Sequence, residues 1–128
     1  MAVPAGVFGT LLGFHRAWAW VVILGNAMAG VWALAAWRWP QLRTRSLWWF
    51  TAGVEAAVAV QVATGVGMVV GHHARPPAFH PFYGFVAVIV VGFLFAYRQA
   101  LWYRRYALYG FGGLFLAGVA IRALVLAR

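Results

Sequence analysis

Four long apolar runs, separated by short polar segments, limit the fold of this chain more than any other feature of its sequence. They cover about residues 14–36, 47–70, 81–97 and 106–127. A helix of about 20 residues, rising about 1.5 Å per residue, crosses the roughly 30 Å hydrocarbon core of a bilayer. The spacing therefore predicts an all-α integral membrane protein, with four transmembrane helices in an up-down bundle that forms one domain over residues 1–128.

The composition supports this class and excludes others. The chain is 66 % hydrophobic and only 9 % charged, whereas roughly a quarter of the residues of a soluble domain are charged. It has no cysteine, which excludes disulfide exchange, iron–sulfur clusters held by cysteine, and thiolate zinc sites. The first thirteen residues lack the basic region of a signal peptide, so we expect them to belong to the mature protein.

The placement of the ten arginines predicts an orientation in the membrane. Two loops on one side hold six of them: Arg38, Arg43, Arg45, Arg98, Arg104 and Arg105. The other four are Arg16, Arg75, Arg122 and Arg128. Positively charged loops remain in the cytoplasm. We therefore expect the protein to lie in the inner membrane of a bacterial cell, with the six-arginine loops in the cytoplasm and both termini outside. Because the arginines are spread among apolar segments rather than gathered in one patch, nucleic-acid binding is not expected.

The stretch GHHARPPAFHPFYGF, residues 71–85, holds three of the four histidines. His72 and His73 end the second apolar run, His80 precedes the third, and His15 opens the first. Three separate segments thus bring imidazoles to a single layer on the predicted outer side. Ligation of a b-type haem by two imidazoles needs two neutral histidines on facing helices, a slot lined by small residues, and cations for the propionates.

We interpret His15 and His80 as the ligand pair, with His73 as the reserve ligand. Small residues near them could form the slot: Ala19, Gly84 and Gly118. The available cations are Arg16, Arg75 and Arg122. This layout resembles that of membrane four-helix b-type cytochromes, which implies haem b and electron transfer, as a redox protein or as a subunit of a respiratory complex.

A weak internal duplication supports the same pair. Phe14-His15 recurs as Phe79-His80, and each is followed by an apolar run that ends in an aromatic-arginine dipeptide, Trp37-Arg38 or Tyr97-Arg98. The pattern predicts two tandem helical hairpins related by an axis along the membrane normal. Such an axis would place His15 opposite His80.

The helical period indicates which faces point inward. From His15 one face carries Ala19, Val22, Asn26 and Gly30, and from Arg122 the matching face carries Gly118, Phe115 and Phe111. Glu55 and His73 are five turns apart and share a face if the helix continues through Gly71.

Glu55 is the only acid in the chain. A carboxylate exposed to lipid is costly, so we expect Glu55 to face the interior. Asn26 lies at a similar depth, which predicts a neutral Glu55 hydrogen-bonded to Asn26. The functional alternative is a proton-relay or ion site, with Gln61 as a further polar step.

Other interpretations stay open at this stage. Four histidines could ligate copper or zinc. The protein could equally be a cofactor-free accessory subunit that packs against other membrane subunits or copies of itself. A small transporter or channel using Glu55 is a further alternative. Hydrolytic catalysis has no support, since Ser46 is the only serine and aspartate is absent, and we expect no catalytic activity of the chain on its own.

Overall fold

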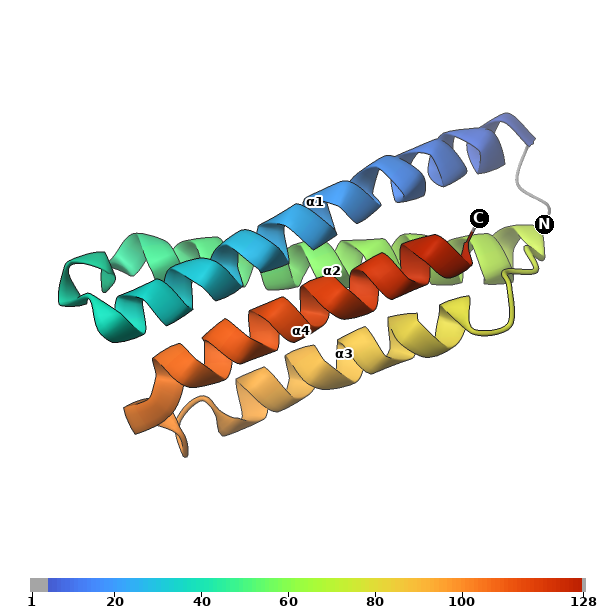
Figure 1. Ribbon diagram of the computed structural model, residues 1–128. Coiled ribbons are helices and arrows are strands. Elements are labelled where there is room, and N and C mark those ends of the chain that lie inside the picture. The colour runs from blue at the N-terminus through green and yellow to red at the C-terminus, as the bar shows by residue number, and fades with distance from the viewer. Residues whose placement is uncertain (1–4, 128) are drawn as a thin grey trace.

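The computed structural model describes residues 5–127 as four long helices and two short 3₁₀ turns (Figure 1). The helices are α1 (Ala5–Arg38), α2 (Arg45–His72), α3 (His80–Tyr97) and α4 (Arg105–Leu126), with η1 (Pro40–Leu42) and η2 (Trp102–Arg104) in the connections. No strand occurs within the described residues. All four helices are long and apolar enough to cross a membrane. The predicted all-α class is confirmed.

The helix ends agree with the apolar runs to within two residues everywhere except at the start of α1. That helix begins at Ala5, nine residues before the start of the predicted span at about residue 14. Residues 5–13 contain no proline, and their one polar side chain, Thr10, donates a hydrogen bond to Gly6 O at 3.0 Å. Nothing in this segment interrupts the backbone ladder, so the helix extends over 34 residues, or about 51 Å.

Successive helices are joined at alternate ends of the bundle, and residues 5 and 127 lie at the same end (Figure 1). The most extensive contact joins α1 and α4, the first and last helices of the described chain. By contrast, α2 and α3 contact each other only thinly. The two-hairpin repeat stays a prediction.

Glycines make the α1–α4 contact possible. A side chain at Gly30 would place its Cβ 2.8 Å from Gly110 O, and one at Gly113 would place it 2.9 Å from Gly30 Cα. Both distances are too short for real atoms, so the two backbones meet directly. Small residues at a crossing allow this approach in membranes. We call Gly30, Gly110 and Gly113 the glycine seam.

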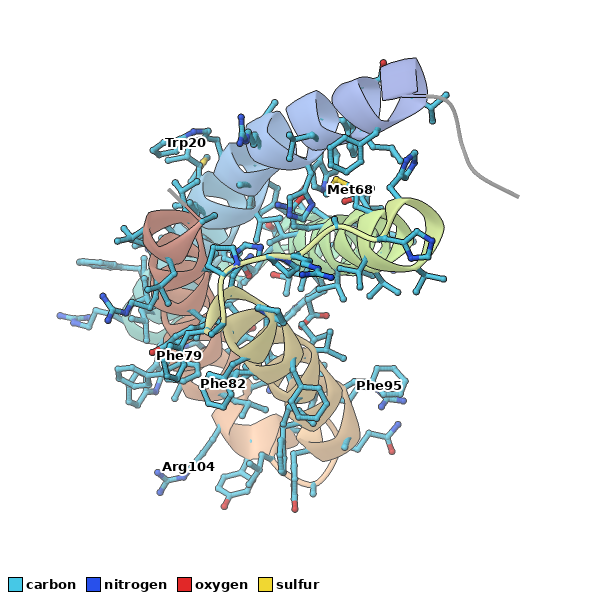
Figure 2. The ribbon with its side chains drawn as sticks, turned by 90° about the vertical axis from the view of Figure 1, so that its right-hand side faces the viewer. Trp20, Met68, Phe79, Phe82, Phe95 and Arg104 are labelled. Carbon is cyan, nitrogen blue, oxygen red and sulfur yellow. The ribbon has the colours of Figure 1, made fainter. Side chains whose placement is uncertain are left out.

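Viewed along the bundle, large apolar side chains radiate outward (Figure 2). Trp20, Phe79, Phe82 and Phe95 point away from the other helices and are each more than half exposed, whereas Met68 lies between α1 and α2 and is buried. An apolar exterior of this kind suits a lipid environment.

The predicted inward face of α1 is confirmed, because Ala19, Val22, Asn26 and Gly30 are all buried. The predicted inward face of α4 is wrong: Arg122, Gly118, Phe115 and Phe111 are exposed. The buried face of α4 instead carries mainly small residues and leucine, namely Tyr106, Gly110, Gly113, Leu116, Ala117 and Val119. A long arginine can extend along the outside of a helix toward water, so its position in the sequence does not mark the inner face.

At the arginine-rich end of the bundle, arginine side chains contact the backbone carbonyls and aromatic rings at the helix ends. Arg43 donates from Nε to Ala36 O at 2.7 Å and from Nη2 to Trp37 O at 2.9 Å, which satisfies two carbonyls at the end of α1. The guanidinium of Arg105 lies 4.4 Å from the ring centroid of Trp102 and 4.7 Å from that of Tyr106. These contacts hold the two loops, and the side of the membrane that they face stays a prediction.

Candidate functional site

The structure brings His15 and His80 together at the end of the bundle opposite the arginine-rich loops. His15 lies on α1 and His80 is the first residue of α3. Their ring centroids are 6.0 Å apart and their planes are inclined by 75°. Both side chains are half-buried. The pairing of these two histidines, expected from the sequence, is therefore present in the structure.

A short chain of hydrogen bonds fixes the tautomer of His15. Its Nδ1 lies 2.9 Å from Thr64 Oγ1 on α2, and the Thr64 hydroxyl itself donates to Gln61 O at 2.9 Å. Since the hydroxyl proton is already used, His15 Nδ1–H must donate to Thr64. Gln61 Nε2 completes the loop by donating to His15 O at 2.8 Å. In the neutral ring, Nε2 therefore keeps its lone pair.

His80 is held in the same tautomer by a different helix. Its Nδ1 lies 2.8 Å from Ala123 O on α4. A carbonyl only accepts, so Nδ1 carries the proton and Nε2 keeps its lone pair. Histidines that bind metals almost always donate their second ring N–H to a carbonyl, carboxylate or water, which orients the ring. Both imidazoles therefore make, through Nδ1–H, the kind of hydrogen bond that orients a metal-binding histidine.

Because Gly65 on α2 has no side chain, the His15 ring can pack against the backbone there. A Cβ at Gly65 would lie 3.2 Å from His15 Cε1, closer than most real contacts. On the other side, a Cβ at Gly84, one turn into α3 from His80, would meet nothing within 4 Å. The ring of His15 is therefore seated against bare backbone on α2, while open space remains beside α3.

The other two histidines do not join this pair. His72 is the last residue of α2, and its ring lies 5.0 Å from that of Phe8. His73 follows the helix in a left-handed conformation (φ 55°) and is exposed. Within residues 5–127 no three histidine or acidic side chains are placed to share a metal ion. The helix ends one residue too early for His73 to share the Glu55 face.

The three arginines proposed as counter-charges lie on the outside of the molecule. Arg16 follows His15 on α1, Arg122 precedes Ala123 on α4, and Arg75 lies in the connection between α2 and α3; all three are exposed. Two of them are thus next in sequence to a residue of the histidine site. None of the three side chains is buried within the bundle.

Glu55 and Asn26 line one small cavity deeper in the bundle, together with Thr51 and Tyr109. The hydrogen bond expected between them is not formed. Asn26 Nδ2 donates to Val22 O at 2.8 Å on its own helix, and the buried Glu55 Oε1 has no partner. Gln61 lies with His15 rather than at this cavity. The Asn26 amide bonds to a carbonyl one turn earlier on its own helix instead of to Glu55. Oε1 of the Glu55 carboxyl is therefore without a hydrogen-bond partner.

Sequence reasoning missed Thr64, Gly65 and the carbonyl of Ala123. The first two form a polar-small pair in the half of α2 nearest the histidines, which is a usable signal. A backbone carbonyl carries no sequence signal. No protein-family model matches the chain, and neither does any curated protein or solved structure.

Proposed function

We propose that this protein is a membrane-embedded electron-transfer protein in which His15 and His80 hold the iron of a b-type haem. The observation that carries the proposal is the separation of their ring centroids, 6.0 Å. With metal–nitrogen bonds of about 2 Å, two imidazoles have centroids roughly 5 Å apart at a tetrahedral metal and roughly 6 Å apart in a linear arrangement. The observed separation is close to that of the linear case; since edge-to-face ring pairs span about 4.5–7 Å as well, the proposal rests on this separation together with the hydrogen bonds of the two rings.

The surroundings support the same ligand. Both Nε2 atoms are free, and both Nδ1–H groups are held by acceptors on neighbouring helices. A haem held in this way supplies reversible one-electron chemistry. Thr64 and Ala123 would orient the two histidines that would hold the haem. Arg16 and Arg122, each next in sequence to a residue of the histidine site, would supply cations for its propionates.

The test is an absorption spectrum of the detergent-purified protein, expressed with an adequate supply of haem. We expect a reduced-minus-oxidised haem signal with about one haem per chain. A folded protein that takes up no haem would contradict the proposal.

The cofactor-free accessory subunit is the second candidate, favoured by the outer face of α2. Small residues are exposed there over four turns, and a Cβ at Gly53 or Gly67 would meet nothing within 4 Å. Such a face suits a helix of another subunit or of a second copy. A haem-free protein that migrates as a defined oligomer in detergent would favour this function.

The orientation forms part of the proposal, since it puts the histidine pair on the outer side. The chain has no cysteine, so Thr44→Cys and Ala74→Cys each provide a single label site, one at each end of the bundle. We expect a membrane-impermeant thiol reagent to label Ala74→Cys from outside intact cells. Labelling of Thr44→Cys under the same conditions would reverse the assignment.

A further inference from the structure

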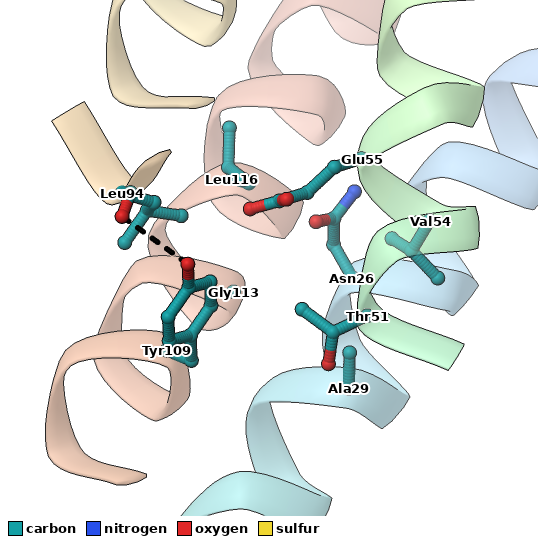
Figure 3. A pocket seen from close by; sticks show the side chains of 9 residues that line it. All are labelled: Asn26, Ala29, Thr51, Val54, Glu55, Leu94, Tyr109, Gly113 and Leu116. Atoms are coloured by element: carbon teal, nitrogen blue, oxygen red, sulfur yellow. Dashed lines mark hydrogen bonds between the residues drawn. The ribbon is translucent and has the colours of Figure 1, made fainter. Parts of the chain in front are cut away.

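The cavity around Glu55 is a second polar site, remote from the histidine pair. Along α1, Asn26 lies eleven residues beyond His15, or about 16 Å. Glu55 of α2 and Tyr109 of α4 line the same space as Asn26, and Thr51 lies below Glu55 and Asn26 in the view of Figure 3. The cavity measures about 10 Å³, roughly the space that holds one water molecule or one small ion.

The donors around this cavity are mostly used elsewhere. The hydroxyl of Thr51 donates to Leu47 O at 2.8 Å, and that of Tyr109 donates to Leu94 O at 3.2 Å. Asn26 donates one of its two Nδ2–H groups to Val22 O. The lining therefore presents oxygen lone pairs from four side chains and few free hydrogens.

The carboxyl group lacks a protein partner. Glu55 Oε1 is buried and makes no hydrogen bond. The remaining lining residues are uncharged, Ala29, Val54, Leu94, Gly113 and Leu116, so no histidine or arginine faces it, and Tyr109 is the only other titratable group. An unpaired carboxylate in such surroundings is strongly unfavourable.

We propose that this cavity binds a single small monovalent cation, with Glu55 as the charged ligand and Asn26, Thr51 and Tyr109 as neutral oxygen ligands. Hard cations prefer carboxylate, amide and hydroxyl oxygens. A proton on Glu55 would satisfy one acceptor, whereas a cation interacts with several at once. The site does not depend on the histidine pair.

Radioactive sodium binding to the purified protein tests this proposal, measured at alkaline pH in a choline chloride background. We expect saturable binding of about one sodium ion per chain, which decreases as protons compete for the carboxylate at lower pH. Glu55→Gln should abolish binding. Thr51→Val, which removes one neutral ligand and keeps the shape, should weaken it about tenfold.

Thr10→Val is the matched control. Thr10 also donates to a carbonyl four residues earlier, but it is exposed near the start of α1. This variant should bind sodium as the unaltered protein does. Absence of sodium binding in the folded unaltered protein would overturn the proposal, and so would equal binding by a folded Thr51→Val or Glu55→Gln. Because haem content is not measured here, these outcomes leave the proposed function unaffected.

Discussion

The histidine end and the Glu55 cavity are both polar sites inside an apolar bundle, yet their hydrogen bonds run in different directions. At the histidine end the bonds cross between helices: His15 on α1 reaches Thr64 on α2, and His80 on α3 reaches α4. At the cavity, Asn26 and Thr51 each bond to a carbonyl four residues earlier on their own helix, and only Tyr109 bonds across, to Leu94 O of α3.

The two sites therefore differ in whether hydrogen bonds hold their side chains in position before a ligand binds. Bonds between helices fix the direction of a ring before any ligand arrives, which is the condition for precise metal coordination. At the cavity, the Tyr109–Leu94 bond joins α4 to α3, whereas the bonds of Asn26 and Thr51 leave α1 and α2 unconnected there. We therefore expect the histidine end to be ordered without its ligand, and the α1 and α2 walls at Glu55 to be joined by what binds there.

The largest expected effect comes from removing either imidazole. His15→Ala and His80→Ala should each lose nearly all bound haem, because each deletes an axial ligand. His72→Ala, at the same end but paired with Phe8, should keep it. Haem per protein, measured by the pyridine haemochrome spectrum, provides the comparison. Retention of haem by both His15→Ala and His80→Ala would remove the pair from the proposal.

Gly65→Val should produce the next largest loss, because its side chain would enter the space of the His15 ring, 3.2 Å from the glycine's missing Cβ. Gly67→Val is the control, since that position is open. Most haem should be lost from the first variant and little from the second. Sodium binding should be unchanged in both, because Gly65 lies ten residues, or about 15 Å, from Glu55. Parallel loss of both ligands would show that the two sites are coupled.

Thr64→Val tests the outer hydrogen bond of His15 alone. Valine keeps the shape and removes the acceptor of Nδ1–H, and loss of such a partner lowers metal affinity by roughly 10- to 100-fold. Haem titration of the apoprotein should detect this shift. Thr51→Val, the equivalent change at the cavity, should leave haem affinity unaltered. Unchanged affinity in Thr64→Val would mean that the His15–Thr64 bond does not orient the ligand.

The smallest effect on haem binding is expected for Tyr109→Phe. This variant loses the hydrogen bond to Leu94 O at 3.2 Å, which contributes about 0.5–1.5 kcal/mol to stability. The midpoint of denaturation in mixed detergent micelles should fall slightly, with haem content preserved. A loss of haem would contradict the separation of the two sites.

The number and type of the helices followed directly from the sequence, because runs of about 20 apolar residues have few alternatives in a bilayer. The inner face of α1 was also predictable, since small and polar residues recur there at the helical period, from Ala19 to Gly30. The same period failed on α4. It was anchored on Arg122, a side chain long enough to leave the interior.

The candidate sites were predictable in part. The position of His15 and His80 in one layer followed from the span boundaries, and the structure places their ring centroids 6.0 Å apart. Their hydrogen bonds were not predictable, since one acceptor is the backbone of Ala123. The partner expected for Glu55 was wrong, because nothing in a sequence decides between a bond across helices and one within a helix for Asn26.

The glycine seam has a consequence for the order of assembly in the cell. Its two sides, Gly30 on α1 and Gly110 and Gly113 on α4, are about 80 residues apart in the chain. At about 5–20 residues per second, the ribosome needs several seconds to produce the second side after the first. During that interval the glycine face of α1 lacks its partner on α4. The tightest contact of the finished bundle is therefore among the last to form, and a slow or interrupted synthesis would leave this surface open to other membrane helices.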